Sequence, residues 1–377
     1  MRSQEARGYS ASLELMWGME SRLGGTKPYR VTRFIRPHEF IVIEGRPRLE
    51  GEPSRILYLV RHVGIDTRRA GLRVARALDA REFEYAGLKD AMAVVYQYYT
   101  FNTSKRKTLT LEGGRIKAWP LGPSPPLRPG RHTGNKFILY LETSDPSGLC
   151  RDLEATRWIP GYYGPQRFGV LRPNTHYMGM LLGENRLGSL IAEYKYRYPL
   201  EELREEPGYY ERTFIERAIG SRTPWERHSA WPVRFALQAL QAYLFNRALS
   251  IALREDIRAY AEHWGVIECF DRAFKVPMAR LPAPGIRAKS RWAKLVWSIA
   301  EEEGLNWMLM RGGPGLRRAF RPLLYPVCSK IVCKVVEDKV KTMIALPRGA
   351  YVTVAIWQNT VVDWSSLEYS TPDDGLA

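Results

Sequence analysis

Strand patterns lie at both ends of the chain with helical patterns between them, and this order is the strongest constraint on the fold. Runs of β-branched and aromatic residues bounded by Pro, Gly and charges are typical of strands. Near the start they span 40–44, 56–60, 94–101 and 137–141. Similar runs return at 329–336 and 351–356. We therefore expect one sheet assembled from both ends of the chain, in a mixed α/β (α+β) fold.

The middle of the chain is predicted to be mainly helical. From about Trp158 helical patterns dominate, and one apolar stripe repeats every three to four residues. Its members are Leu237, Leu240, Leu244, Ala248 and Ile251. A chain of 377 residues is expected to form about two domains. We predict a discontinuous sheet domain at 30–157 and 328–364, and an inserted helical domain at 158–327. The proline-rich stretch 120–130 is expected to be an extended loop.

The chain is strongly basic, with a formal charge of +17 and a pI near 9.7. Such a charge favours a polyanionic partner, because each phosphate contact releases counterions. Genome composition or heat adaptation is an alternative cause. Aromatic and basic residues alternate strictly over 194–198, which suits an RNA surface, although a half-buried strand explains the pattern equally well.

The cysteines and the hydropathy limit the remaining classes of protein. Cys150, Cys269, Cys328 and Cys333 form no CxxC pair and have no histidine at metal-ligand spacing. We expect reduced structural thiols and no metal site. Residues 1–30 lack the apolar core of a signal peptide, and no apolar run approaches the roughly 18 residues of a membrane span. We expect a cytoplasmic protein.

A charged pair, Lys89-Asp90, stands in a turn between a predicted helix and a predicted strand. The helix is expected to begin at Asp66 or Thr67, with Ala70 and Val74 on its apolar side. The strand at 94–101 follows, so Asp90 is predicted to lie at the mouth of the sheet. Such a pair usually marks a solvated turn. Here its neighbours are apolar, and a carboxylate facing a polyanion is repelled unless it has chemistry to perform.

The segment around this pair resembles the G-x-K-D-x-x-A-x-x-x-Q signature of the TruD family of tRNA pseudouridine synthases. Gly87, Lys89, Asp90, Ala93 and Gln97 carry that resemblance. Five other segments resemble the family's boxes in the same order along the chain. They are 37–44, 127–130 with 134–137, 162–169, 241–246 and 346–353.

The resemblance implies a pseudouridine-synthase catalytic sheet with an inserted TRUD domain, acting on uridine 13 of tRNA without a cofactor. Asp90 would be the catalytic residue, as a nucleophile or as a base; the sequence does not choose between these roles. Phe137 would stack on the extruded base, or else begin a strand as a core residue. Asn135 beside it would form hydrogen bonds to the substrate. Lys89 would pair with Asp90 or contact phosphate. The expected partner is tRNA, and a monomer is favoured.

Further RNA contacts are expected from charged residues elsewhere, each with a structural alternative. Glu44 would approach the substrate or orient its neighbours at a strand end. Arg167 would contact RNA or belong to a rigid turn at the entry to the inserted domain. The basic residues Lys105, Arg106 and Lys107, and a second run at 317–321, would bind the RNA backbone or form solvated faces.

The chain departs from the family's pattern at four places. Ala91 stands where a basic residue is usual, Val95 where a hydroxyl is usual, Phe34 where a lysine is usual, and Gly161 where an asparagine is usual. These changes remove polar groups, so a non-catalytic RNA-binding protein or tRNA chaperone of the same fold is the alternative function. A methyltransferase is disfavoured, because no glycine-rich loop follows a first strand.

Overall fold

The chain divides into two compact units, each described here by itself. The computed structural model describes residues 15–23, 29–169, 174–183, 231–310, 316, 318–362 and 367–369. The sheet unit comprises 26–159, 266–275 and 325–377. The helical unit comprises 1–25, 160–265 and 276–324. Residues 266–275, which the sequence placed in the inserted domain, group with the sheet unit. The alternating stretch 194–198 lies outside the described residues.

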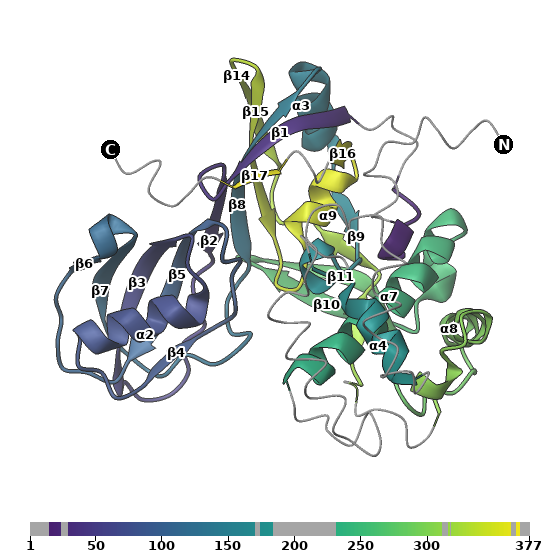
Figure 1. The fold of residues 1–377 in the computed structure, drawn as a ribbon, viewed down its shortest axis with the longest axis horizontal. Coiled ribbons are helices and arrows are strands. Elements are labelled where there is room, and N and C mark those ends of the chain that lie inside the picture. The colour runs from purple at the N-terminus through teal and green to yellow at the C-terminus, as the bar shows by residue number, and fades with distance from the viewer. Residues whose placement is uncertain are drawn as a thin grey trace. The chain divides into compact units, whose positions relative to one another are not determined.

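The described residues of the sheet unit form a mixed sheet of twelve strands, shown in Figure 1. Its main path runs β14-β15-β8-β2-β5-β3-β7-β6, while β1 pairs with β8, β16 and β17, and β4 pairs with β5. The strands are β1 (Tyr29–Arg36), β2 (Phe40–Glu44), β3 (Arg55–Val63), β4 (Phe83–Tyr85), β5 (Val94–Phe101), β6 (Leu109–Leu111), β7 (Ile116–Ser124), β8 (Asn135–Thr143), β14 (Val332–Val336), β15 (Lys339–Leu346), β16 (Thr360–Val362) and β17 (Leu367–Tyr369). The prediction of one sheet built from both ends of the chain is confirmed, because β8 pairs with β2 on one side and with β15 on the other.

The helix α2 (Thr67–Ala77) begins where its cap was predicted. The side chain of Asp66 accepts a hydrogen bond from the Arg69 amide at 2.9 Å, which satisfies one of the free N–H groups at the helix start. Ala70 and Val74 are fully buried. They pack against β3, β5 and β7 in one hydrophobic cluster, so α2 covers one face of these strands (Figure 1). This packing positions the segment of the chain that leads into the loop carrying Asp90.

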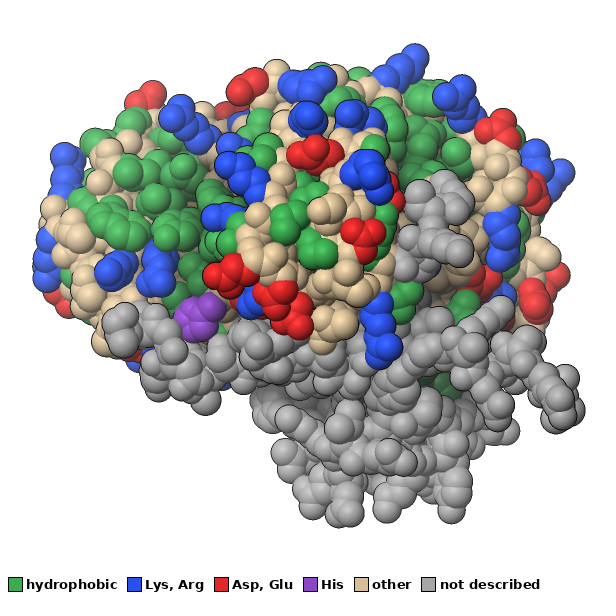
Figure 2. Space-filling view, turned by 90° about the horizontal axis from the view of Figure 1, so that it is seen from above, with side chains coloured by type: hydrophobic (Ala, Val, Ile, Leu, Met, Phe, Trp, Pro, Cys, Tyr) green, Lys and Arg blue, Asp and Glu red, His purple; other side chains and the backbone are tan. Residues whose placement is uncertain are grey.

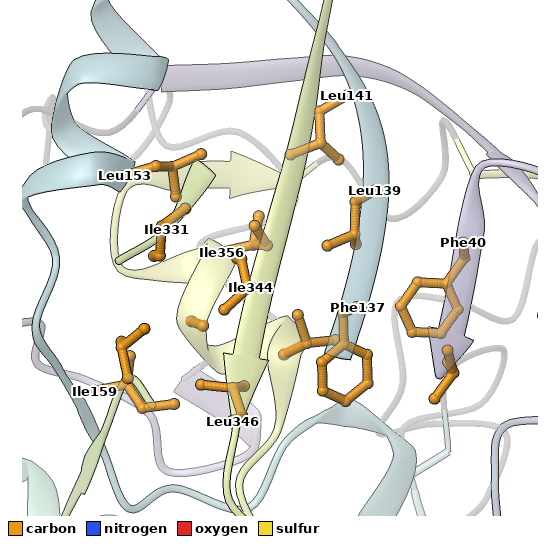
Figure 3. Packing of buried hydrophobic residues seen from close by; sticks show 14 of the residues in the cluster. Phe40, Phe137, Leu139, Leu141, Leu153, Ile159, Ile331, Ile344, Leu346 and Ile356 are labelled. Carbon is orange, nitrogen blue, oxygen red and sulfur yellow. The ribbon is translucent and has the colours of Figure 1, made fainter. Parts of the chain in front are cut away.

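A second hydrophobic cluster lies around β8, β15 and two further helices. The helices are α3 (Pro146–Ala155) and α9 (Val352–Trp357). Figure 3 shows Phe40, Phe137, Leu139 and Ile344 pointing into this core. Along β8 the buried residues Phe137 and Leu139 alternate with less buried ones. Successive side chains of a strand point to opposite faces of the sheet, so this alternation places one face of β8 in the core.

The segment predicted as a strand at 351–356 is helical instead, and that prediction is wrong. Its residues form α9, in which Val352, Val354 and Ile356 are all buried. A short apolar run that is buried on all sides has the same composition in a strand and in a helix, so periodicity cannot separate them. A turn at Gly349, with φ +84°, precedes α9.

The proline-rich stretch was predicted to be a loop, and this is wrong for its first part. Pro120 and Pro123 lie within β7 and face Tyr58 and Ile56 of β3. The pairing of β6 with β7 extends only from Ile116 to Ala118, so both prolines lie where β7 has a free edge. An edge tolerates proline because no ladder hydrogen bond is required there.

The expectation of four reduced thiols is also wrong. Cys150 is bonded to Cys333, and Cys269 is bonded to Cys328. The partners are separated by 183 and 59 residues along the chain, so their spacing carried no sign of pairing. The first bridge joins α3 to β14, and the second lies in a small buried cluster with Ala345.

The helical unit is built around α7 (Trp231–Arg254), which confirms the predicted helix. Buried residues occur on all sides of α7, as expected for a helix at the centre of a unit. The other helices are α4 (Thr175–Gly183) and α8 (Arg291–Glu302). Of the described strands outside the twelve-stranded sheet, β12 (Phe320–Pro322) belongs to the helical unit. The others have residues in both units: β9 (Trp158–Pro160), β10 (His263–Cys269), β11 (Arg272–Arg280) and β13 (Leu324–Pro326). The helical unit also contains the short 3-10 turns η2 (Pro165–Arg167), η4 (Ile257–Tyr260) and η5 (Asn306–Met308), whereas η1 (Glu112–Gly114) lies in the sheet unit.

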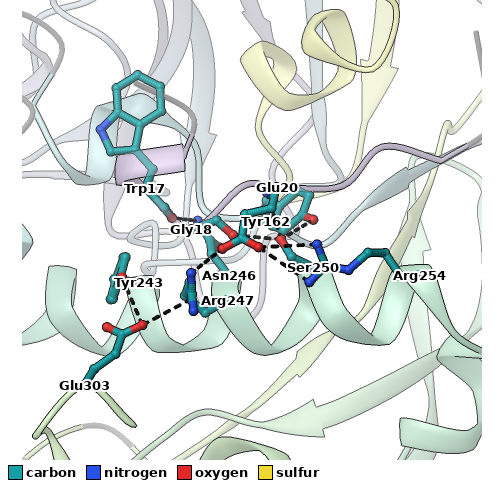
Figure 4. Close-up of polar contacts among 10 residues, drawn as sticks. All are labelled: Trp17, Gly18, Glu20, Tyr162, Tyr243, Asn246, Arg247, Ser250, Arg254 and Glu303. Carbon is teal, nitrogen blue, oxygen red and sulfur yellow. Dashed lines mark hydrogen bonds and ion pairs between the residues drawn. The ribbon is translucent and has the colours of Figure 1, made fainter. Parts of the chain in front are cut away.

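Polar side chains inside α7 hold the N-terminal segment 15–23, as Figure 4 shows. The Asn246 amide donates to the carbonyls of Trp17 and Tyr163, and accepts from the Tyr163 N–H. The Ser250 hydroxyl donates to the Gly18 carbonyl at 2.7 Å. These buried groups are satisfied, which explains how a polar residue is tolerated inside the core of this unit.

The surface does not show a single basic patch on the face drawn in Figure 2. Lys and Arg side chains are spread there among acidic and hydrophobic ones. No helix among the described residues is long and apolar enough to cross a membrane.

Candidate functional site

Asp90 lies in the loop between β4 and β5, at the place that the sequence predicted. The loop is held to its surroundings by backbone hydrogen bonds, with Ala86 accepting from the Gly130 N–H at 2.6 Å and Ala93 accepting from the Gly64 N–H at 3.2 Å. The Asp90 carboxylate accepts a hydrogen bond from the Met92 N–H at 3.0 Å, and the residue is partly exposed. A side-chain bond to the backbone two residues ahead fixes both the turn and the direction of the carboxylate.

The ammonium group of Lys89 forms an ion pair with a buried carboxylate. Its Nζ lies 2.5 Å from the Glu44 Oε1, and the two side chains are 5% and 0% exposed. Glu44 also accepts the Tyr98 N–H at 3.0 Å. Burial raises the pKa of the Glu44 carboxyl, while the charge and hydrogen bond of Lys89 oppose that rise. Lys89 thus forms an ion pair with Glu44, whereas the sequence suggested a pair with Asp90.

The burial of Glu44 argues against one of its two predicted roles, direct contact with RNA. A side chain that is closed to solvent cannot reach RNA in this arrangement, so direct RNA contact by Glu44 does not fit the structure. The alternative, that Glu44 orients its neighbours at a strand end, fits its two hydrogen bonds. We describe it as a positioning residue.

Three further polar residues, whose roles were not foreseen, complete the support of the loop. The Thr67 hydroxyl accepts the Lys89 N–H at 2.9 Å and donates to the Gln97 side chain at 3.1 Å. The Gln97 amide donates to the Gly87 carbonyl, and the Tyr99 hydroxyl donates to the Thr67 carbonyl at 2.8 Å. Gln97 belongs to the motif in sequence, but only the fold reveals that it holds the loop from β5.

His132 lies against the same loop. A Cβ placed on Gly87 would be 3.5 Å from both the His132 Cε1 and the Lys89 Nζ. Burial, followed by the charges of Lys89 and Arg348, lowers the pKa of His132 to about 3, so the imidazole is neutral. No sequence pattern marked this residue, since it falls between two family boxes.

Asn135 and Phe137 lie on the β8 strand beside β2, with Asn135 opposite Glu44 and Phe137 opposite Val42. The Oδ1 of Asn135 is buried and has no hydrogen-bond partner among the described residues. The Phe137 ring is 8% exposed and stacks on Phe40, with centroids 6.2 Å apart (Figure 3). Asn135 therefore offers an unused acceptor next to the Glu44–Lys89 pair, while Phe137 is largely a core residue in this arrangement.

The residues of the first predicted basic run are not brought to Asp90. Asp90 precedes β5, whereas Lys105, Arg106 and Lys107 follow it, and the two ends of an eight-residue strand are roughly 23 Å apart. All three are exposed, and Lys105 forms an ion pair with Asp79. This pairing lowers the pKa of the Asp79 carboxyl.

The arginines of the helical unit have structural contacts. Arg167 lies in η2, with its guanidinium 5.5 Å from the rings of Tyr163 and Phe235, which favours the rigid-turn alternative. In the second basic run Arg321 is buried and donates to the carbonyls of Gly161 and Tyr162. It stabilises the turn at 161–163 and is closed to an RNA partner.

Two of the residues that depart from the family pattern, Ala91 and Val95, lie among the described side chains. Val95 is fully buried in the same core as Phe137, and Ala91 is partly buried in the loop beside Asp90. The side chain of Phe34 is outside the described residues. Within the part of the chain that the structure describes, no group of three His, Cys, Asp or Glu could hold a metal ion.

Comparison with known proteins agrees with this geometry. The family described as tRNA pseudouridine synthase D (TruD) matches residues 34–217, which include the Asp90 loop, Glu44, Asn135 and Phe137. Over these residues the chain matches the TruD family. The probable tRNA pseudouridine synthase D of Methanopyrus kandleri is 28% identical, over 82% of this chain and 86% of that protein.

A bacterial protein and a solved structure with related descriptions are similarly distant along most of their length. The tRNA pseudouridine synthase D of Pseudomonas syringae is 26% identical over 82% of this chain and 84% of its own. A Methanosarcina mazei protein whose crystal structure carries the description TruD superposes with a TM-score of 0.69 at 19% identity. The superposition covers 94% of this chain and 99% of that protein. This likeness shows that the mixed fold is that of a TruD structure.

Proposed function

We propose that this chain is a tRNA pseudouridine synthase that isomerises uridine to pseudouridine, at uridine 13 of tRNA, with Asp90 as the catalytic carboxylate. Its relatives are named tRNA pseudouridine synthase D. The observation that carries the proposal is the support of the loop at 86–93. The neighbours of Asp90 are held by Thr67, Gln97 and Glu44, the Asp90 carboxylate is oriented by the Met92 N–H, and Asp90 as a residue is partly exposed.

Such an arrangement suits an isomerase. The C1′–N1 bond of uridine breaks, the base turns, and a C1′–C5 bond forms; the proton lost from C5 is balanced by one gained at N1. No electrons are gained or lost, so the reaction needs no redox cofactor. Asp90 acts as a nucleophile at C1′ or C6, or as a base at C2′, and its fixed direction serves each of these roles.

The uridine must leave the RNA stack before it can reach a carboxylate, at a cost of about a few kcal/mol. We propose that Asn135 then donates or accepts a hydrogen bond at the edge of the base, because its buried Oδ1 lacks a protein partner. Phe137 would contribute by closing the apolar side of this position rather than through a freely exposed ring.

The sheet domain proposed from the sequence, 30–157 with 328–364, would be the catalytic domain, because it contains Asp90 and its supporting residues. The inserted segment 158–327 would be the TRUD domain. This assignment of the two domains depends on the proposed function.

The function is tested on unmodified tRNA transcripts in which pseudouridine is mapped chemically. We expect one product position at uridine 13, and no product in a transcript that carries cytidine at that position. Modification at another uridine would overturn the assigned position while leaving the activity. Tight binding without any product would instead support the non-catalytic RNA-binding alternative.

A further inference from the structure

A pocket in the helical unit is not explained by the isomerisation site. It has a volume of about 240 Å³ and is formed entirely by residues 280–286 and 318–320. Its apolar floor is made by the nearly buried side chains of Leu281, Ala283 and Ile286. Pockets that enclose a drug-sized ligand are larger, roughly 300–1,000 Å³, so we expect an occupant no larger than about one nucleotide.

Two guanidinium groups and one aromatic ring line this pocket. Arg280 and Phe320 are direct partners across the antiparallel pair β11–β12. The Arg280 guanidinium lies 5.5 Å from the centroid of the Phe320 ring, and that ring is 42% exposed. Cross-strand neighbours of this kind hold each other in place, so the ring and the charge are presented together.

Arg318 is the second arginine of the lining. Its guanidinium is 3.5 Å from the place that a Cβ would take on Gly285, a residue with φ +81°. The turn at 283–286 is fixed by hydrogen bonds from the Gly285 N–H to Leu309 and from the Ile286 N–H to Ala283. The exposed side chain of Arg318 is therefore carried over a rigid turn, where a glycine leaves room for it.

One carboxylate stands near these two cations. Glu262 lies 3.8 Å from the Arg280 Nε, and its side chain is 6% exposed. It already accepts hydrogen bonds from the Arg280 N–H and the Ser290 hydroxyl. Because Glu262 is buried outside the lining, the described residues of the lining present two positive groups and no negative one.

We propose that this pocket binds one nucleotide of the substrate RNA, distinct from the isomerised uridine. The phosphate would contact Arg280 and Arg318, and the base would stack on Phe320. Guanidinium groups match phosphate oxygens, and RNA-binding proteins stack unpaired bases on aromatic rings or on arginine. The charge of +17 favours an anionic occupant over a neutral metabolite, and the aromatic ring favours a nucleotide over an acidic peptide. The assignment of RNA rests on the proposed function.

The test measures the dissociation constant for unmodified tRNA over a series of salt concentrations. We expect Arg318→Ala and Phe320→Leu each to weaken binding about tenfold, the usual loss for one stacked base or one good phosphate contact. Phe320→Trp should retain the affinity, because it keeps the stacking face. Arg318→Ala should also lower the salt slope by about one, since one phosphate contact is lost.

The matched control is Arg258→Ala, an exposed arginine of the same unit outside the pocket. It should change the dissociation constant less than twofold. Equal losses in Arg258→Ala and Arg318→Ala would overturn the pocket in favour of diffuse charge. Unchanged binding by Phe320→Leu would overturn the stacking contact. Melting temperatures of all variants separate these effects from loss of the fold.

Two further measurements distinguish a failure of this proposal from a failure of the proposed function. Binding by the pocket variants is measured independently of product formation, so a chain without any isomerase activity can still show the expected loss of binding. Adenosine 5′-monophosphate alone is the second probe. Tight binding of that free nucleotide, with tRNA binding unaffected by the variants, would reassign the pocket to a small-molecule ligand and overturn the RNA proposal.

Discussion

The ammonium of Lys89 and the carboxylate of Glu44 form an ion pair closed to solvent, with 2.5 Å between Nζ and Oε1. The pair joins the end of β2 to the loop that carries Asp90. A buried pair of this kind does little for net stability, but it restricts the loop to the geometry in which both charges are satisfied. The position of Asp90 thus depends on a residue 46 positions earlier in the chain, through its neighbour Lys89.

Removing one partner of this pair should destabilise the protein strongly. Glu44→Ala leaves a buried ammonium without a counter-charge, and we expect the free energy of unfolding to fall by about 3–5 kcal/mol. The control is Glu82→Ala, whose exposed pair with Arg55 should contribute less than about 1 kcal/mol. Chemical denaturation of both variants makes the comparison. A loss at Glu44 no larger than that at Glu82 would contradict a buried role.

Replacing Asn135 should lower activity without lowering stability. Its Oδ1 is buried without a partner among the described residues, so Asn135→Leu removes an unsatisfied group. We expect stability to stay level or rise, because a buried unpaired acceptor costs about 1–3 kcal/mol. Turnover of tRNA should fall at least tenfold. If activity is kept, or if it falls only along with stability, Asn135 does not contact the substrate.

The stability of the sheet unit should depend on pH through His62. Burial lowers the pKa of this imidazole to about 4, below the value of 6.5 for an exposed histidine. As the pH falls below 6.5 the unfolded chain takes up a proton first, so stability that is fully present above 6.5 is lost towards pH 4. Between pH 7 and 5 the loss from this group is about 2 kcal/mol.

His62→Gln removes the titrating group and should flatten the pH dependence of the melting temperature over that range. The exposed His263 supplies the comparison, because His263→Gln should leave the slope as it is. Parallel slopes for wild type and His62→Gln would mean that His62 is not held neutral in the folded state.

The sequence predicted the parts of the fold that depend on local pattern. The Asp66 cap, β5, and the stripe of α7 each follow from neighbouring residues, and each is where it was expected. What depends on distant residues was missed. The segment at 352–357 is helical because it is buried, and no property of its six residues distinguishes that from a buried strand.

The candidate site divides in the same way. The motif located Asp90 and Lys89, but the partner of Lys89 comes from β2, and the group that holds Gly87 comes from β5. Neither link is visible without the pairing of β2 with β5. His132 reaches the loop only because Gly130 bonds to Ala86.

The bridge between Cys150 and Cys333 should stabilise the sheet unit. It closes a segment of 183 residues between α3 and β14, and bridges typically contribute about 2–4 kcal/mol by restricting the unfolded chain. Replacing both cysteines with serine should lower the melting temperature. A reducing agent should then have a smaller effect on the variant than on the wild type. An equal response of both proteins to the reductant would show that this bridge contributes nothing.

The most direct test of the account is pseudouridine formation by Asp90→Asn on unmodified tRNA. The substitution keeps the size of the side chain and an oxygen that can accept from Met92, so the loop should be retained. We predict product from the wild type, none from Asp90→Asn, and equal tRNA binding by the two proteins. If Asp90→Asn still converts uridine to pseudouridine at a comparable rate, Asp90 is not the catalytic carboxylate.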